Sequence, residues 1–270
     1  MKRLFFLFLR SYILRFFFKF NYTLRKTVKE KKILSQIKNL KIYKTNHQLI
    51  RLGESGDGGY LVPDDLSGIA ACFTGGVGPM IKFEHDLAIR GIKCFMADYS
   101  VNNLPPPIHS KFFFTKKFLG TQNKNIYINC NQWLSENTKN NEDYIFKIDI
   151  EGDEYKILLN ITEENLLRMR MIIFEIHDFS NILFPLGFEI IKSLFDKLQK
   201  HHSIVHICPN NVSPPVRFSK KLTLYDQLEI TLLRNDRISY REYAKNFPHP
   251  LDSKNNNFFK SKLPECFYLE

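Results

Sequence analysis

The chain has 270 residues, enough for one α/β domain with a sizeable hydrophobic core. Its net charge of +11 is uneven: residues 1–44 hold 13 Lys and Arg residues and a single acid, whereas the remainder carries 26 bases and 27 acids. This distribution argues against nucleic acid as a partner, because a nucleic-acid-binding domain carries its basic side chains on a face of the fold. The five cysteines are scattered and show no CxxC spacing, which argues against a disulfide framework or a zinc knuckle and indicates a reducing, cytoplasmic compartment.

The first 26 residues are rich in Phe and in basic residues. Their longest apolar run, Leu4–Leu9, is far shorter than the roughly 18–20 residues of a spanning helix. Arg10, Arg15 and Lys19 interrupt what would be the hydrophobic stretch of a signal peptide. We expect residues 1–26 to lie peripherally on the inner face of a membrane, with packing on the chain's own domain or on a partner as the alternative.

Helical spacing of apolar residues from residue 27 to residue 44 predicts a linking helix. We therefore divide the chain into a basic, aromatic N-terminal segment, residues 1–44, and a globular domain, residues 45–270.

Short apolar strands alternate with helical stretches from residue 68 onward. Strands are expected at residues 69–74, 92–97, 125–128, 144–150, 171–176, 203–207 and 228–233, and helices at residues 79–90, 132–137, 153–159 and 182–200. Strands that are apolar on both faces and separated by helices indicate a parallel sheet. A loop, with no helical pattern, separates the last two strands, so the last strand is expected to be antiparallel. The predicted fold is an α/β, Rossmann-like, seven-stranded and mostly parallel sheet with an antiparallel last strand and helices on both faces.

A glycine-rich turn follows the first of these strands. Gly75, Gly76 and Gly78 let the backbone turn sharply before a helix, which is typical of a nucleotide-type ligand site. Asp98 ends the next strand, where an acid can accept hydrogen bonds from ribose hydroxyls. A dinucleotide fingerprint needs a third glycine where this chain has Ile81, whereas a sulfonium cofactor has no phosphates and needs only the tight turn.

Charged residues cluster at the ends of the fourth and fifth predicted strands. Asp149 and Glu151 share one face with Lys147, and Glu175 and His177 share one face of the next strand. Adjacent parallel strands would bring the three acids Asp149, Glu151 and Glu175 and the imidazole of His177 around one opening. There His177, with a carboxylate to orient it, is a candidate general base, and Asp149 is the alternative. A divalent cation held by these groups is an alternative, and acids that merely begin the next helix are another.

Several ordered motifs resemble one family of enzymes. Residues 146–158, FKIDIEGDEYKIL, resemble the signature of FkbM-type methyltransferases, and residues 51–60, RLGESGDGGY, resemble a segment of a related group of methyltransferase domains. Later motifs of this group are matched at residues 174–177, 206–211, 228–231 and 248–252. The resemblance implies a Rossmann-like methyltransferase fold, S-adenosylmethionine as methyl donor, and O-methylation of a saccharide, lipid-linked glycan or other small-molecule acceptor.

The resemblance also implies roles for single residues. Gly75, Gly76 and Gly78 are expected near the methionine part of the cofactor, Asp98 at its ribose, Asp149 where donor and acceptor meet, and Asp57 at the border of the same cleft. The chain departs from many methyltransferases in having no acid shortly before the glycine turn, where residues 72–74 read CFT.

The acceptor is expected to meet the loop after the sixth predicted strand. Asn210 and Asn211 are candidates to hydrogen-bond a polyhydroxylated acceptor, or else plain turn formers. Two other functions stay open at this point: an NAD-dependent oxidoreductase on the same sheet, and a catalytically inactive, membrane-associated binding module.

Overall fold

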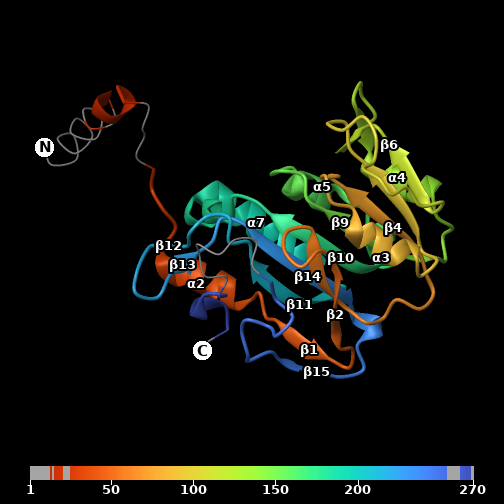
Figure 1. The fold of residues 1–270 in the computed structure, drawn as a ribbon. Helices are drawn as coiled ribbons and strands as arrows, with labels where there is room; N and C mark the ends of the chain where they lie inside the picture. Colours follow the sequence, from red (N-terminus) through yellow and green to blue (C-terminus); the bar gives the residue numbers. More distant parts are fainter. Residues whose placement is uncertain (1–12, 14, 21–24, 254–261, 269–270) are drawn as a thin grey trace, which may run out of the picture.

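A seven-stranded sheet forms the centre of the computed structural model, which describes residues 13, 15–20, 25–253 and 262–268 (Figure 1). The strand order is β11-β14-β10-β9-β4-β5-β6. All neighbours are parallel except β14, which runs antiparallel to both β10 and β11. The predicted seven-stranded, mostly parallel sheet with an antiparallel last strand is therefore confirmed. Its strands are β4 (Ile69–Gly75), β5 (Lys93–Ala97), β6 (Phe112–Thr115), β9 (Asp143–Ile148), β10 (Met169–Ile176), β11 (His202–Pro209) and β14 (Leu228–Arg234).

Helices and small two-stranded sheets surround this centre. The α-helices are α2 (Glu30–Lys38), α3 (Lys82–Ala88), α4 (Cys130–Glu136), α5 (Glu154–Asn160), α6 (Glu163–Arg168) and α7 (Pro185–Leu198), and short 3-10 helices are η1 (Phe179–Leu183), η2 (Asn235–Arg237) and η3 (Glu265–Phe267). The paired strands are β1 (Tyr43–Thr45) with β15 (Arg241–Tyr243), β2 (Leu49–Gly53) with β3 (Gly59–Pro63), β7 (Phe118–Gly120) with β8 (Tyr127–Asn129), and β12 (Val216–Arg217) with β13 (Thr223–Leu224).

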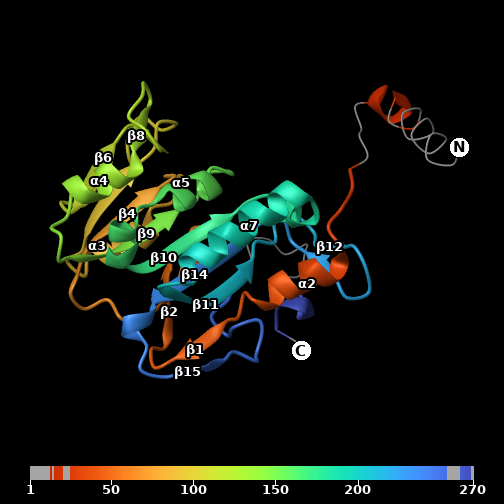
Figure 2. The ribbon, with the colours of Figure 1, turned by 180° about the vertical axis from the view of Figure 1, so that it is seen from behind.

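Side chains that alternate along the buried strands enter two separate hydrophobic clusters, because successive strand residues point to opposite faces. Phe73 and Phe146 belong to a cluster that includes residues of α2, α4, α5, α6 and α7. Cys72 and Ile145 belong to a cluster that includes residues of α3 and of the β2–β3 hairpin. The opposite views in Figures 1 and 2 show α3 and α7 on different sides of the sheet.

The predicted linking helix is shorter than expected, because strand pairing begins soon after it. Helix α2 ends at Lys38, and β1 pairs with β15 from Tyr43 onward. Ile33 and Ile37 are fully buried in the sheet's own core cluster. Helix α2 thus packs as part of the core, and the division of the chain at residue 44 stays a prediction. None of the helices in the described part of the chain is long and apolar enough to cross a membrane.

One predicted strand of the central sheet was wrong. Residues 125–128 do not join the central sheet: β8 begins at Tyr127 and pairs only with β7. The strand beside β5 is instead β6, Phe112–Thr115, which occupies the edge of the sheet and is mostly half-exposed. Both segments are short and apolar, and only long-range pairing decides which of them extends the sheet.

Candidate active site

The chain reverses its direction across the sheet between β4 and β9. It first proceeds outward through β5 and β6 and then returns to build β9, β10 and the remaining strands on the other side of β4. Ligands of open α/β sheets bind at such a switch point, outside the carboxyl ends of the strands. At this point the backbone N–H of Asp149 donates to the carbonyl of Gly75 at 3.0 Å. The glycine turn and the acidic end of β9 are therefore in direct contact.

The three glycines of the turn differ in the space that a side chain would find at their positions. A Cβ on Gly75 would lie 2.3 Å from the Leu119 side chain. Gly76 has a φ of +82°, and a Cβ there would lie 1.8 Å from the carbonyl oxygen of Asp149. A Cβ on Gly78 would meet nothing closer than the Met80 nitrogen at 4.0 Å. Packing thus explains Gly75 and Gly76, whereas Gly78 faces open space that a bound group can approach.

Asp98 connects the second strand to the glycine turn. One carboxylate oxygen accepts from the backbone N–H of Val77 at 2.8 Å, and the other accepts from the Ser100 backbone N–H and hydroxyl at 2.7 and 2.6 Å. Each carboxylate oxygen has two lone pairs, so the oxygen that accepts from Val77 retains capacity for one further donor. Asp98 therefore fixes the turn and can still accept from one hydroxyl group.

A buried ion pair lies beneath the turn, and the sequence did not predict it. Lys147 of β9 donates to Glu84 of α3 at 3.1 Å, and the Thr74 hydroxyl donates to the same oxygen at 2.8 Å. Glu84 thus provides, from the following helix, an acid beside the glycine turn that residues 72–74 do not contain. Lys147, which shares a strand face with Asp149, is engaged in this pair.

Four carboxylates surround His177 at the ends of β9 and β10. The Nδ1 atom of His177 lies 3.2 Å from Glu154. Its Nε2 atom faces Glu151 at 3.5 Å, Glu175 at 3.8 Å and Asp149 at 3.9 Å. The structure thus brings together the four side chains Asp149, Glu151, Glu175 and His177 that the strand periodicity indicated.

Glu154 is a further member of the cluster, and the sequence analysis assigned it only to the start of a helix. It is fully buried and accepts backbone N–H groups from Ile150 at 2.8 Å and Gly152 at 3.0 Å, in addition to its contact with His177. The Glu154 carboxylate therefore stabilises the turn after β9 and also orients the imidazole of His177. The only available signal was an acid in the first turn of α5, a position that is common without any such role.

The backbone at this edge adopts conformations that non-glycine residues rarely occupy. Glu151 and Asp178 have φ angles of +55° and +52°. They follow β9 and β10 respectively, so both turns that present the cluster are left-handed. Such conformations cost free energy and persist where the surrounding structure imposes them, which is frequent at functional sites.

Burial or the neighbouring carboxylates raise the pKa values of three groups in the cluster. Burial and the charge of Asp149 raise the pKa of Glu175 to about 8. Burial alone would lower the pKa of His177, but the hydrogen bond and charge of Glu154, with the charges of Glu175 and Asp149, raise it to about 9. Burial also raises the pKa of Asp149, against the opposing effects of Lys147 and His177. At neutral pH His177 therefore holds a proton and acts as a base only after losing it.

The remaining predicted residues lie around the cluster. Asn210 is buried, and its amide donates to Glu175 at 2.9 Å, while its own oxygen accepts from the backbone N–H of Val212. Asn211 is also buried. Asp57 is exposed at the tip of the β2–β3 hairpin, close enough for its charge to contribute to the raised pKa of Glu175.

Three of the clustered side chains have a geometry that could hold a divalent cation. Asp149, Glu151 and His177 each offer a ligand atom, and these atoms lie within 4.8 Å of one another. The Nδ1 contact of His177 with Glu154 is the kind of outer contact that orients metal-binding imidazoles. The cluster thus fits two chemistries, proton transfer and cation binding.

The fold places this cluster at the topological switch point of an α/β sheet, the position where ligands of such folds bind. Residues 106–202 match the family model described as Methyltransferase FkbM domain. A comparison with curated proteins finds no significant match. The match confirms the resemblance to FkbM-type methyltransferases and supports methyltransferase activity. It includes the cluster around His177 and stops short of the glycine turn, Asp98, Asn210 and Asn211.

Proposed function

We propose that this protein transfers a methyl group from S-adenosylmethionine to a hydroxyl oxygen of a saccharide or lipid-linked glycan. The observation that supports it most is the direct contact between the glycine turn and Asp149 at the switch point. This contact brings the glycine turn, which is the proposed cofactor subsite, beside the acidic cluster. Methyl transfer needs that arrangement, because alignment of donor and acceptor can contribute roughly 7–11 kcal/mol to lowering the barrier.

The residues fit the proposed donor. Gly78 leaves open space beside the turn, and Asp98 retains a lone pair for a ribose hydroxyl. When bound, S-adenosylmethionine supplies a methyl group activated by a positively charged sulfur. The carboxylates of Asp149 and Glu151 favour a positive charge nearby, whereas they disfavour the diphosphate of NAD. Cluster electrostatics therefore favour the sulfonium cofactor over the dinucleotide.

The residues also suit a neutral, hydroxyl-rich acceptor. Carboxylates accept hydrogen bonds and offer no donors when ionised, so Asp149 and Glu151 would bind and orient hydroxyl groups. His177 is held at Nδ1 by Glu154, which leaves Nε2 directed into the cluster. In this proposal the deprotonated Nε2 takes the hydroxyl proton, and Glu154 is a positioning residue that stabilises the resulting imidazolium.

Calorimetric titration of the full-length chain with S-adenosylmethionine and, separately, with NAD tests this proposal. The full chain is needed because α2 contributes to the core. We expect saturable binding of S-adenosylmethionine, weakened at least tenfold in Asp98→Asn with its melting temperature as the control for folding. An Asp149→Ala variant is expected to remain folded and to lose turnover on an acceptor identified by screening glycans. Binding of NAD alone, or full turnover by Asp149→Ala, would overturn the proposal.

A further inference from the structure

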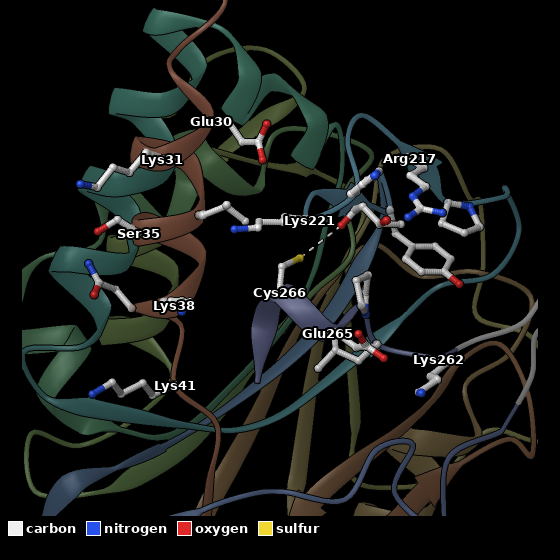
Figure 3. A pocket seen from close by; sticks show the side chains of 18 residues that line it. Glu30, Lys31, Ser35, Lys38, Lys41, Arg217, Lys221, Lys262, Glu265 and Cys266 are labelled. Atoms are coloured by element: carbon white, nitrogen blue, oxygen red, sulfur yellow. Dashed lines mark hydrogen bonds between the residues drawn. The ribbon is translucent and has the colours of Figure 1, made fainter. Parts of the chain in front are cut away.

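A cavity of about 1150 Å³ lies between α2, the β12–β13 hairpin and residues 262–266 (Figure 3). Leu34, Leu263 and Cys266 contribute apolar surface to its lining. Charged side chains from the three segments surround this apolar part, as the labels in Figure 3 show. The cavity is separate from the glycine turn and the His177 cluster, none of whose residues line it.

The lining of the cavity is strongly basic. Helix α2 and the residues after it contribute Lys31, Lys38 and Lys41, and the opposite wall contributes a further group of cations: Arg217, Lys220, Lys221 and Lys262. Only Glu30 and Glu265 are acids, and the Glu30 carboxylate already accepts from the Ser219 hydroxyl at 3.0 Å. Seven cations thus face two acids around one hollow.

Five of these lysines have no carboxylate partner within the described part of the chain. Among the described residues, Lys31, Lys38, Lys220, Lys221 and Lys262 form no ion pair with a carboxylate. Other cations of the fold are paired, for example Arg234 with Asp143 at 2.7 Å and Lys147 with Glu84 at 3.1 Å. An excess of like charges creates a positive potential that attracts anions.

The sequence around the cavity indicates which anion is involved. Helix α2 lies within the N-terminal segment, residues 1–44, which holds 13 bases and one acid. Within that segment Phe16, Phe18 and Phe20 are exposed by 54%, 76% and 60%. Exposed aromatic side chains beside many bases are the combination that binds the interface of an anionic membrane.

We propose that the cavity between α2 and the β12–β13 hairpin binds the phosphate headgroup of an anionic membrane lipid. Phosphate oxygens accept charge-assisted hydrogen bonds from the lysine ammonium groups and from Arg217. The N-terminal Phe residues then enter the interface beside the bound headgroup. This docking does not depend on the proposed methyl transfer, so the two proposals can fail separately.

Sedimentation of the full chain with lipid vesicles tests the headgroup site. One vesicle set contains phosphatidylcholine with phosphatidylglycerol, and the other contains phosphatidylcholine alone. We expect binding to the first set only, weakening as salt is raised. The double variant Lys220→Gln/Lys221→Gln should bind roughly 25-fold more weakly, since each base near an anionic leaflet contributes about a fivefold factor. The matched control Lys93→Gln/Lys124→Gln removes two exposed lysines outside the cavity and should bind much as the native chain does.

Three results would overturn the proposal. The first is native-like vesicle binding by the Lys220/Lys221 variant, which would assign any membrane affinity to the N-terminal segment alone. The second is an equal loss in the control variant, which would indicate a dependence on net charge only. The third is saturable binding of inorganic pyrophosphate that depends on Lys220 and Lys221 without vesicle binding, which would assign the cavity to a soluble phosphate ligand.

Discussion

Gly76 and Gly78 stand two residues apart, yet their replacement by alanine should have different consequences. At Gly76 the new Cβ would lie 1.8 Å from the carbonyl oxygen of Asp149, at a φ of +82°. A left-handed conformation costs a non-glycine residue about 1–2 kcal/mol, and the forced displacement adds about 1–3 kcal/mol. Gly76→Ala should therefore lower the free energy of unfolding by about 2–5 kcal/mol.

Gly78→Ala is the matched comparison. Its Cβ would have no heavy atom closer than 4.0 Å, so the fold should tolerate it. The methyl group would instead occupy space proposed for the cofactor. We expect an unchanged melting temperature together with a loss of S-adenosylmethionine affinity of about tenfold, or ~1.4 kcal/mol.

Thermal unfolding followed by circular dichroism and calorimetric titration separate the two effects. For a chain of this size the destabilisation of Gly76→Ala corresponds to a drop in melting temperature of roughly 4–20 °C. A native melting temperature in Gly76→Ala would refute the steric reasoning. Native cofactor affinity in Gly78→Ala would refute the placement of the cofactor beside the turn.

Three further predictions concern the buried charges. Glu154→Gln removes the charge that supports protonated His177, so the pKa of His177 should fall by at least about one unit in an NMR titration; an unchanged value would contradict the role of Glu154. His177 and Glu175 bind protons more tightly in the folded state, so their contribution to stability is complete below about pH 4.5 and is lost as pH rises through about 8 to 9. Urea midpoints should accordingly fall between pH 6 and 9, and a rise over this range would contradict the shifts. Lys147→Met leaves Glu84 buried without its ammonium partner and should lower the free energy of unfolding in urea by about 3–5 kcal/mol. Adding Glu84→Gln to this variant should restore part of the lost stability. A double variant no more stable than Lys147→Met would argue against the ion pair.

The sequence was most informative where local pattern determines position. The apolar strands β4, β9 and β10 were evident because both of their faces are buried, and period-two alternation then placed Asp149 and Glu175 at the carboxyl ends of adjacent strands. The glycine turn was evident because Gly76 needs a φ that other residues avoid. In these places a residue's neighbours along the chain are sufficient to indicate what it does.

Long-range contacts limited the rest of the prediction. The choice between Phe112–Thr115 and residues 125–128 as the strand beside β5 depends on pairing between distant segments. Glu84 lies ten residues after Thr74, and only the packing of α3 against the sheet brings it beneath the turn. Glu154 likewise reads as an ordinary acid of a first helical turn until the fold places His177 against it.

The proton on His177 provides the last prediction, because it separates the two chemistries that the cluster allows. A general base must be deprotonated, and the pKa of His177 is raised to about 9. If His177 is the base, kcat/KM in the presence of a chelator should rise nearly tenfold per pH unit from pH 6 and level off near pH 9. The His177→Gln variant should be slow at every pH and lack this rise.

A divalent cation would change the profile in a defined way. A cation held by Asp149, Glu151 and the Nε2 atom of His177 would displace the proton, so activity would depend on added Mg²⁺ or Mn²⁺ and the rise would shift to lower pH. The exposed Glu151 distinguishes the cases. Glu151→Gln should abolish activity if a bound cation is required, whereas under a base mechanism it should raise KM for the acceptor and keep the pH dependence of kcat. A chelator-treated enzyme with a flat profile from pH 6 to pH 9 would refute the assignment of His177 as the base, since that assignment requires the rate to follow the loss of its proton.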